Sequence, residues 1–281
     1  MIIHPYVRGS KSVKALKDYL EGVGHHTVVL HRRPMRPRAR IVSWGARDID
    51  YVLDGFRVLN HPSYTAVFCN KLRFFEQADP RFVPEWTVPD RAEAHLDAIS
   101  GWFEHGSPVV ERHKLSGKSG EGIRVVEPTL IEGGVSLAEI QRAPLYVKYE
   151  RKTDEFRVHV FKNREGEFYV AHVQKKVAAP DRVQAGDIRN WHVRNHENGF
   201  IFQQHGFDCP ALVSDTALGL VRTSFPEIDF VALDVIYHNG TAKKAADRTE
   251  PRAFVLEGNT APGMEGTTVQ VYGDFLLERF R

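Results

Sequence analysis

The first part of the chain alternates short apolar runs with a helical repeat of apolar positions. Residues 2–7 and 27–30 have the composition of strands, and residues 12–20 between them carry apolar side chains at helical spacing. Two further strand-like runs continue the series, at 39–44 and 58–60. Because strand, helix, strand order favours a parallel sheet, we predict a small α/β domain over residues 1–77.

The pattern then changes to short alternating runs. Residues 79–84 hold two prolines and predict a linker, and residues 92–103 have the spacing of a helix. Apolar runs at 109–112 and 123–127 flank a polar loop rich in glycine, which is typical of a β-hairpin. We therefore predict a linker and a small β-rich domain over residues 78–146.

The remaining residues, 147–281, predict a third domain of strands with one long helix. The strands are expected at 146–149, 155–161, 168–173, 230–237 and 253–257, the helix at 209–224, and an irregular polar loop at 186–199. The sequence contains no internal repeat.

Composition narrows the class of protein. The 281 residues are 42% hydrophobic and 26% charged, which is ordinary for a globular protein of one large or two to three small domains. A net charge of only +2 does not call for nucleic acid or an acidic membrane as a partner. Two distant cysteines indicate neither a disulfide framework nor a zinc site, and no apolar stretch has membrane-spanning length. We expect a soluble cytoplasmic protein.

The strand that ends near residue 257 carries the most informative chemistry. Glu257 and Asn259 are two apart, so a strand directs both oxygen-bearing side chains to the same side, where they suit Mg²⁺. Pro262 and Gly263 then allow the backbone to turn close to a ligand. The alternative is a solvated strand end followed by an ordinary turn.

Asp234 lies inside the apolar run 230–236, where an unpaired carboxylate would be costly to bury. We expect a cation or a hydrogen-bond donor beside it. With Glu257 and Asn259 it would complete an oxygen-rich metal site on neighbouring strands. The alternative is an aspartate that faces solvent at a strand end.

Glu155 and Arg157 are also two apart on a predicted strand, where they could hold a ribose hydroxyl and a phosphate oxygen. A cross-strand ion pair is the simpler alternative. Further polar positions could neutralise a transferring phosphoryl group or form a solvated surface: Lys175, Lys176, Arg194 and Asn195.

The polar loop at 116–122 offers backbone N–H groups that could close over phosphates, although it has neither Walker spacing nor a following helix. A flexible hairpin turn is the alternative. His192 and His196 are four apart but have no obvious third ligand for zinc. The basic run 31–40 could touch phosphate or form a solvated loop.

Taken in order, these features resemble the ATP-grasp superfamily over most of the chain. Residues 256–264 are similar to the metal-binding segment of D-alanine–D-alanine ligases, and residues 155–157 to the acidic-x-Arg strand of ribosomal-protein glutamate ligases. The resemblance implies an α/β (α+β) fold: a small N-terminal α/β domain, a β-rich lid and a C-terminal mixed-sheet domain, with ATP between the last two.

The resemblance also implies roles for individual residues. The metal ligands would be Asp234, Glu257 and Asn259, holding two Mg²⁺ ions or Mn²⁺ in their place. The ATP contacts would be Lys71, Arg112, Lys114, Ser116, Gly117, Gly120, Gly122, Lys148, Tyr149 and Glu155. The catalytic contacts would be Arg157, Lys176 and Asn195, and the substrate contacts Gly263, Gly266 and Thr267.

Two departures from the family pattern stand out. The family usually has a lysine on the lid strand where this chain has Arg112, with Lys114 nearby, so either residue could make the lid contact to phosphate. The N-terminal region is also short for a D-alanine ligase. Because that region shapes the first-substrate pocket, substrate identity does not carry over.

The expected activity is that of an ATP- and Mg²⁺-dependent carboxylate–amine ligase. It would form an amide or peptide bond through an acyl phosphate and release ADP and phosphate, with small-molecule, peptide or protein carboxylates and amines as substrates. The alternatives are a kinase on the same scaffold, and a non-catalytic nucleotide- or nucleic-acid-binding module. The sequence leaves the oligomeric state open.

Overall fold

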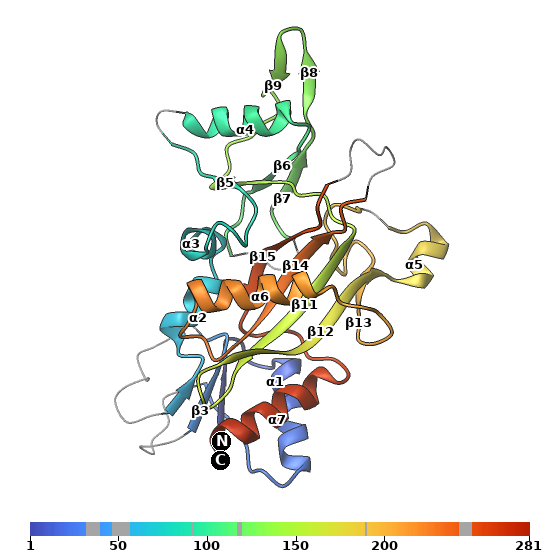
Figure 1. Cartoon of the computed structure of the whole chain (residues 1–281). Helices are drawn as coiled ribbons and strands as arrows, with labels where there is room; N and C mark the ends of the chain where they lie inside the picture. The colour runs from blue at the N-terminus through green and yellow to red at the C-terminus, as the bar shows by residue number, and fades with distance from the viewer. Residues whose placement is uncertain (32–39, 47–56, 91–92, 117–119, 189, 242–248) are drawn as a thin grey trace.

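The computed structural model describes residues 1–31, 40–46, 57–90, 93–116, 120–188, 190–241 and 249–281. An N-terminal parallel sheet and the β-rich unit predicted to be a lid, which keeps that name below, lie at opposite ends of a five-stranded sheet, which forms the middle of the molecule (Figure 1). None of the described helices is long and apolar enough to cross a membrane.

The N-terminal sheet has the strand order β2-β1-β3-β4, and all its pairings are parallel, which confirms the prediction. Its strands are β1 (Ile2–Pro5), β2 (Val28–Val29), β3 (Arg40–Trp44) and β4 (Arg57–Leu59). Helix α1 (Lys11–Gly22) begins where the Ser10 hydroxyl accepts a hydrogen bond from the Val13 backbone N–H.

The C-terminal helix α7 (Thr268–Phe280) completes this end of the molecule, and the sequence pattern did not predict it. It packs against α1, where the Tyr19 hydroxyl donates a 2.7 Å hydrogen bond to Asp274. Tyr272 and Phe275 join Trp44 of the N-terminal sheet in one apolar cluster. The first and last segments of the chain therefore share a core.

Two short helices connect the N-terminal sheet to the rest, α2 (Pro62–Phe68) and α3 (Lys71–Gln77). Although α3 lies within the predicted N-terminal domain, Phe74 and Phe75 pack in the core of the five-stranded sheet and the lid. The sequence pattern did not predict either helix.

The lid contains an antiparallel sheet of order β5-β10-β6-β7, and it confirms the predicted pairing of β6 with β7. Its elements are β5 (Trp86–Thr87), α4 (Ala94–Glu104), β6 (Val109–Arg112), β7 (Ile123–Val126), β8 (Thr129–Ile131), β9 (Gly134–Ser136) and β10 (Leu145–Lys148). Ile99, Trp102 and Phe103 of α4 pack onto one face of this sheet. Strands β8 and β9 form a separate hairpin.

The five-stranded sheet has the order β13-β12-β11-β14-β15. Its strands are β11 (Asp154–Lys162), β12 (Phe168–Ala178), β13 (Phe200–Gln203), β14 (Phe230–His238) and β15 (Arg252–Asn259). We expected a mixed sheet, but every pairing among the described strands is antiparallel, because β11–β12 and β14–β15 each fold back on their neighbour. Helix α5 (Pro180–Ala185) lies beyond β12.

One face of this sheet is apolar and is covered by α6 (Ala211–Ser224), as Figure 1 shows. Val158 and Leu233 point to that face and pack with Val213 and Leu220 of the helix. Because side chains alternate along a strand, the residues between them point to the opposite face, which carries the candidate site.

Candidate functional site

The strand register brings the main predicted residues into one row across the sheet. Arg157 on β11 is paired with Asp234 on β14, and Asp234 is paired with Glu257 on β15. Directly paired residues point to the same face. Residues that are far apart in the chain therefore meet on the face that α6 does not cover.

Arg157 and Asp234 form a buried bidentate ion pair. Arg157 Nε and Nη2 donate to the two Asp234 carboxylate oxygens at 2.7 and 3.0 Å. Burial alone would raise the pKa of Asp234, but Arg157 and Lys176 outweigh it and hold that pKa well below its ordinary value. The expected cationic partner of Asp234 is confirmed, and Asp234 is charged at neutral pH.

Glu155, two residues before Arg157 on β11, extends this charge network. Lys152 Nζ lies 2.7 Å from Glu155 Oε2, and Lys176 bonds the other oxygen and lies 3.6 Å from Asp234 Oδ2. Burial opposes the charge of Glu155, yet the two lysines lower its pKa, while Glu155 and Asp234 raise the pKa of Lys176 against burial. Both oxygens of the carboxylate predicted to hold a ribose thus contact lysines.

Lys152 was not among the candidates from the sequence. It lies in the turn before β11, where no alternation marks its direction, and burial lowers its pKa despite the attraction of Glu155. Its only sequence signal is a position three residues before Glu155.

Two more cations face this row from other elements. Arg112, at the end of β6, is 5% exposed and is drawn to Glu257, and its Nε has no partner among the described residues. Lys71, the first residue of α3, lies 3.6 Å from Glu257 Oε2. Lys114 instead has an exposed side chain that pairs with Glu121. Of the two lid cations, Arg112 is the buried one, and the charge of Glu257 favours its charged form.

The predicted metal ligands share one face of the sheet. Asp234 is paired with Glu257, and Asn259 is paired with Ala232, two positions before Asp234. Asn259 Oδ1 also accepts a 2.9 Å hydrogen bond from the Ala261 N–H. Two carboxylates and an amide oxygen are donors that suit Mg²⁺. Asp234 is held by cations, whereas 41% of the Glu257 side chain is exposed. Histidine, cysteine and acidic residues alone form no metal-binding group of three in the described part of the chain.

The glycine-rich lid loop reaches the polar loop before β13. A Cβ atom on Gly120 would lie 2.9 Å from Val193 Cγ1 and 3.0 Å from Asn195 Nδ2, and Gly120 has a φ of 79°. On the same interface, Glu127 Oε1 lies 3.8 Å from His192 Nε2. Asn195 is therefore in contact with the lid.

The other predicted residues of the lid loop are less informative. Ser116 is exposed, and Gly122 packs closely on Lys114. Gly117 lies outside the described residues, as does most of the basic run at 31–40.

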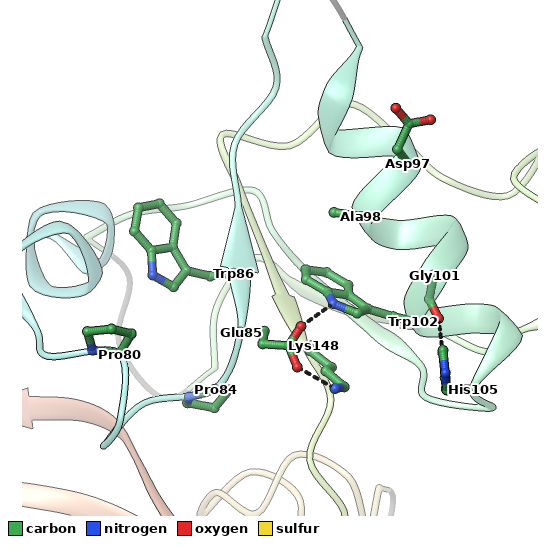
Figure 2. A pocket seen from close by; sticks show the side chains of 10 residues that line it. All are labelled: Pro80, Pro84, Glu85, Trp86, Asp97, Ala98, Gly101, Trp102, His105 and Lys148. Carbon is green, nitrogen blue, oxygen red and sulfur yellow. Dashed lines mark hydrogen bonds and ion pairs between the residues drawn. The ribbon is translucent and has the colours of Figure 1, made fainter.

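Lys148 lies on the other side of the lid sheet, in an open pocket of about 680 Å³ between the linker and α4 (Figure 2). Its Nζ lies 2.6 Å from Glu85 Oε1, and Glu85 Oε2 accepts a 3.0 Å hydrogen bond from Trp102 Nε1. The lid sheet thus lies between the side chain of Lys148 and the charged row. The ring of Tyr149 lies edge-on to His192, with centroids 5.1 Å apart.

The predicted substrate residues lie in the loop between β15 and α7. Gly263 has open space where a side chain would be, and Gly266 has a φ of 55°. The Thr267 hydroxyl is buried and has no partner among the described residues. Ala261 packs on Gly45 at the carboxyl end of β3, so this loop lies where the N-terminal sheet meets the central sheet.

The charges of the site do not balance. Its cations are Lys71, Arg112, Lys152, Arg157, Lys176 and Arg194, the last of which donates to the Thr153 carbonyl between Lys152 and Glu155. Its carboxylates are Glu155, Asp234 and Glu257. Six positive groups against three negative ones leave an excess that suits a polyanion.

No protein-family model matches the sequence, and no curated protein matches it. Solved structures match the fold along nearly its whole length. A RimK domain ATP-grasp protein from Sphaerobacter thermophilus is 17% identical, with a TM-score of 0.58, and the match covers 99% of this chain and 98% of that one. The ATP-grasp ligase PsnB with its minimal precursor is 14% identical, with 98% of each chain covered and a TM-score of 0.61. D-alanine–D-alanine ligase from Bacillus anthracis is 14% identical, with 99% of this chain and 95% of that one covered and a TM-score of 0.57. The chain therefore has the ATP-grasp fold, as the sequence resemblance predicted.

Proposed function

We propose that this protein is an ATP- and Mg²⁺-dependent carboxylate–amine ligase. The observation that carries the proposal is the excess of cations on one face of the five-stranded sheet, beside a glycine-rich lid loop. A triphosphate is the co-substrate whose charge would balance that excess.

The phosphate contacts would come from two sides. Arg157 and Lys176 would contribute from the sheet, and the buried Arg112 of β6 would contribute from the lid. A guanidinium that is already buried and bidentately held needs little reorganisation to meet a charged phosphate oxygen. Arg112 Nε, which has no partner among the described residues, is a donor available for such a contact.

Asp234, Glu257 and Asn259 would hold the metal, because they provide hard oxygen donors on one face. When bound, Mg²⁺ would offset phosphate charge that otherwise repels an incoming carboxylate. Asp234 would then exchange part of its contact with Arg157 for the metal, and Arg157 would become available to the transferring group.

In the reaction we propose, a substrate carboxylate attacks the γ-phosphorus of ATP and gives an acyl phosphate and ADP. An amine then attacks the acyl carbon, the amide bond forms and phosphate leaves. The lid would help to keep water from the acyl phosphate through the contact of Gly120 with the loop around Val193. Thr267, whose hydroxyl lacks a partner among the described residues, would contact the substrate.

Structural neighbours support peptides as one class of substrate. The PsnB structures include complexes with a minimal precursor, Mg and ADP, and with a precursor peptide and AMPPNP. The macrocyclase MdnC from Microcystis aeruginosa is bound to a precursor peptide. We propose that this chain acts on a peptide, protein or small-molecule carboxylate in the cytoplasm.

The test is a screen for acceptors that stimulate release of ADP and phosphate. Amino acids, peptides and candidate proteins are added to the protein with MgATP, and products are identified by mass. A ligase gives free phosphate and a product joined with loss of water, whereas a kinase leaves the phosphoryl group on the acceptor. MgATP binding without stimulation by any acceptor would contradict the ligase proposal and favour a non-catalytic nucleotide-binding module.

A further inference from the structure

A chain of buried polar side chains runs beneath α7, beside the charged row. His159 Nε2 lies 3.0 Å from Gln174 Oε1, and Gln174 Nε2 donates a 3.1 Å hydrogen bond to Thr268 Oγ1. On the other side, His159 Nδ1 lies 3.0 Å from the Tyr272 hydroxyl. Each of these four residues is at most 3% exposed.

The direction of every bond in this chain follows from the groups that make it. Burial lowers the pKa of His159 to about 3, so the imidazole is neutral and carries one proton. Because the Gln174 carbonyl oxygen only accepts, that proton is on Nε2, and Nδ1 accepts from the Tyr272 hydroxyl. The Gln174 amide is thereby oriented with its NH₂ group toward Thr268.

This series of hydrogen bonds connects the strands that carry Arg157 and Lys176 to the start of α7. His159 lies two positions after Arg157 on β11, and Gln174 two positions before Lys176 on β12, all on the same face of the sheet. Thr268 begins α7, directly after the loop that contains Gly263 and Thr267.

The two adjacent threonines differ sharply in their contacts. The Thr268 hydroxyl is bonded to Gln174 and lies 3.5 Å from Gln204 Oε1. The Thr267 hydroxyl is buried without a partner among the described residues. Thr268 is hydrogen-bonded to the sheet, whereas the Thr267 hydroxyl has no partner among the described residues.

We propose that Gln174 is a positioning residue, which through Thr268 fixes the 263–267 loop relative to the strands that carry Arg157 and Lys176. The inference rests on the proposed function, because that loop is where the substrate would meet the phosphate. A loop that is fixed to regular strands holds the reacting groups in place, and a small displacement of those groups lowers the reaction rate.

The test compares Thr268→Val, Thr268→Ser and Thr267→Val, with hydrogen–deuterium exchange of the full chain with and without MgATP. Thr268→Val keeps the shape and removes the hydroxyl, so we expect amides of the 263–267 loop to exchange at least tenfold faster. Exchange in β11 and β12, and the Kd for MgATP, should change less than twofold. Thr268→Ser should restore the wild-type exchange rate of these amides, and Thr267→Val should leave that rate unchanged.

A second variant and a spectroscopic measurement guard against simple misfolding. Gln174→Met should accelerate the same loop amides, and the ¹⁵N signals of His159 should lose the pattern of a fixed Nε2–H tautomer. Unchanged loop exchange in both Thr268→Val and Gln174→Met would overturn the proposal. Absence of MgATP binding in the wild-type protein, with the loop effects intact, would contradict the proposed function and leave the positioning role standing.

Discussion

The two faces of the five-stranded sheet are built from the same strands but differ in the interactions that their buried side chains make. On one face, Val158 and Leu233 pack on α6 in an apolar core. On the other, Arg157 and Asp234 are buried as an ion pair. Apolar burial stabilises the fold, whereas desolvation of a buried ion pair offsets much of its attraction. The comparison indicates that the charged face is retained for chemistry rather than for stability.

The largest expected effect comes from breaking the buried pair on one side only. Asp234→Asn would leave Arg157 with a buried uncompensated charge and should cost about 3–5 kcal/mol in the free energy of unfolding. The double variant Arg157→Met, Asp234→Leu removes both charges and should regain most of that loss. Neither variant should turn over ATP. Urea unfolding and ADP release provide the two measurements.

A matched change on the opposite face sharpens this result. Leu233→Ala should cost about 2–5 kcal/mol in the free energy of unfolding through cavity formation, with the Kd for MgATP nearly unchanged. If the double variant proved as unstable as Asp234→Asn, the pair would be a structural requirement and the contrast between the faces would fail.

Glu257→Gln separates function from stability within the charged face. Because much of this side chain is exposed, the free energy of unfolding should change by less than about 0.5 kcal/mol. Loss of its negative charge should lower the rate of ATP turnover by on the order of 10²–10³-fold. Glu227→Gln, an exposed change in the loop between α6 and β14, is the control and should leave turnover unaffected.

Gly120→Ala tests the contact between the lid and the charged face. The new Cβ would meet Val193 and Asn195 at a positive φ, so closure should be impaired and the KM for ATP should rise about tenfold, equivalent to about 1.4 kcal/mol. Gly133→Ala introduces the same strain in a lid turn that faces open space. Equal effects of the two variants on the KM would show that backbone strain, and not the contact, is responsible.

The acid dependence of stability is small near neutral pH and grows only in acid. Cations hold the pKa of Asp234 and Glu155 in the folded protein below their ordinary values of 3.8 and 4.5. Their stabilising contribution is therefore complete above those values and is lost as the pH falls through the lower folded pKa. We expect the contribution of Asp234 and Glu155 to the free energy of unfolding to be constant from pH 7 to 5. Below about pH 4 it should decline by about 1.4 kcal/mol per pH unit for each carboxylate.

Unfolding curves at several pH values measure this dependence. The Arg157→Met, Asp234→Leu variant, which lacks one of the two carboxylates, should decline less steeply in acid than the wild-type protein. Identical acid slopes would contradict a lowered pKa for Asp234.

The sequence predicted those parts of the site that depend on strand alternation. Glu257 and Asn259 are two apart on β15, so their shared face followed from a period of two, whereas the pairing of Glu257 with Asp234 depends on a β-bulge beside Asp234 that alternation does not predict. Lys152 could not be found in this way, because it precedes β11, and the cationic partners of Glu155 depend on how β11 and β12 pair.

Tertiary packing explains the elements that the sequence did not reveal. Helix α7 begins with β-branched residues and contains Gly273, which weakens its helical signal. In the folded chain Gly273 admits the ring of Tyr19 from α1, where a Cβ would lie 2.3 Å away. The hydrogen bond between His159 and Tyr272 likewise requires α7 to be in place.

The central claim is that the charged face of the sheet binds ATP together with a divalent metal. The most direct test is calorimetric titration of ATP into the wild-type protein and Glu257→Gln, each with and without Mg²⁺. We predict that Mg²⁺ strengthens ATP binding at least tenfold in the wild-type protein and less than twofold in Glu257→Gln. Equal dependence on Mg²⁺ in both proteins, or no dependence in the wild type, would contradict the account.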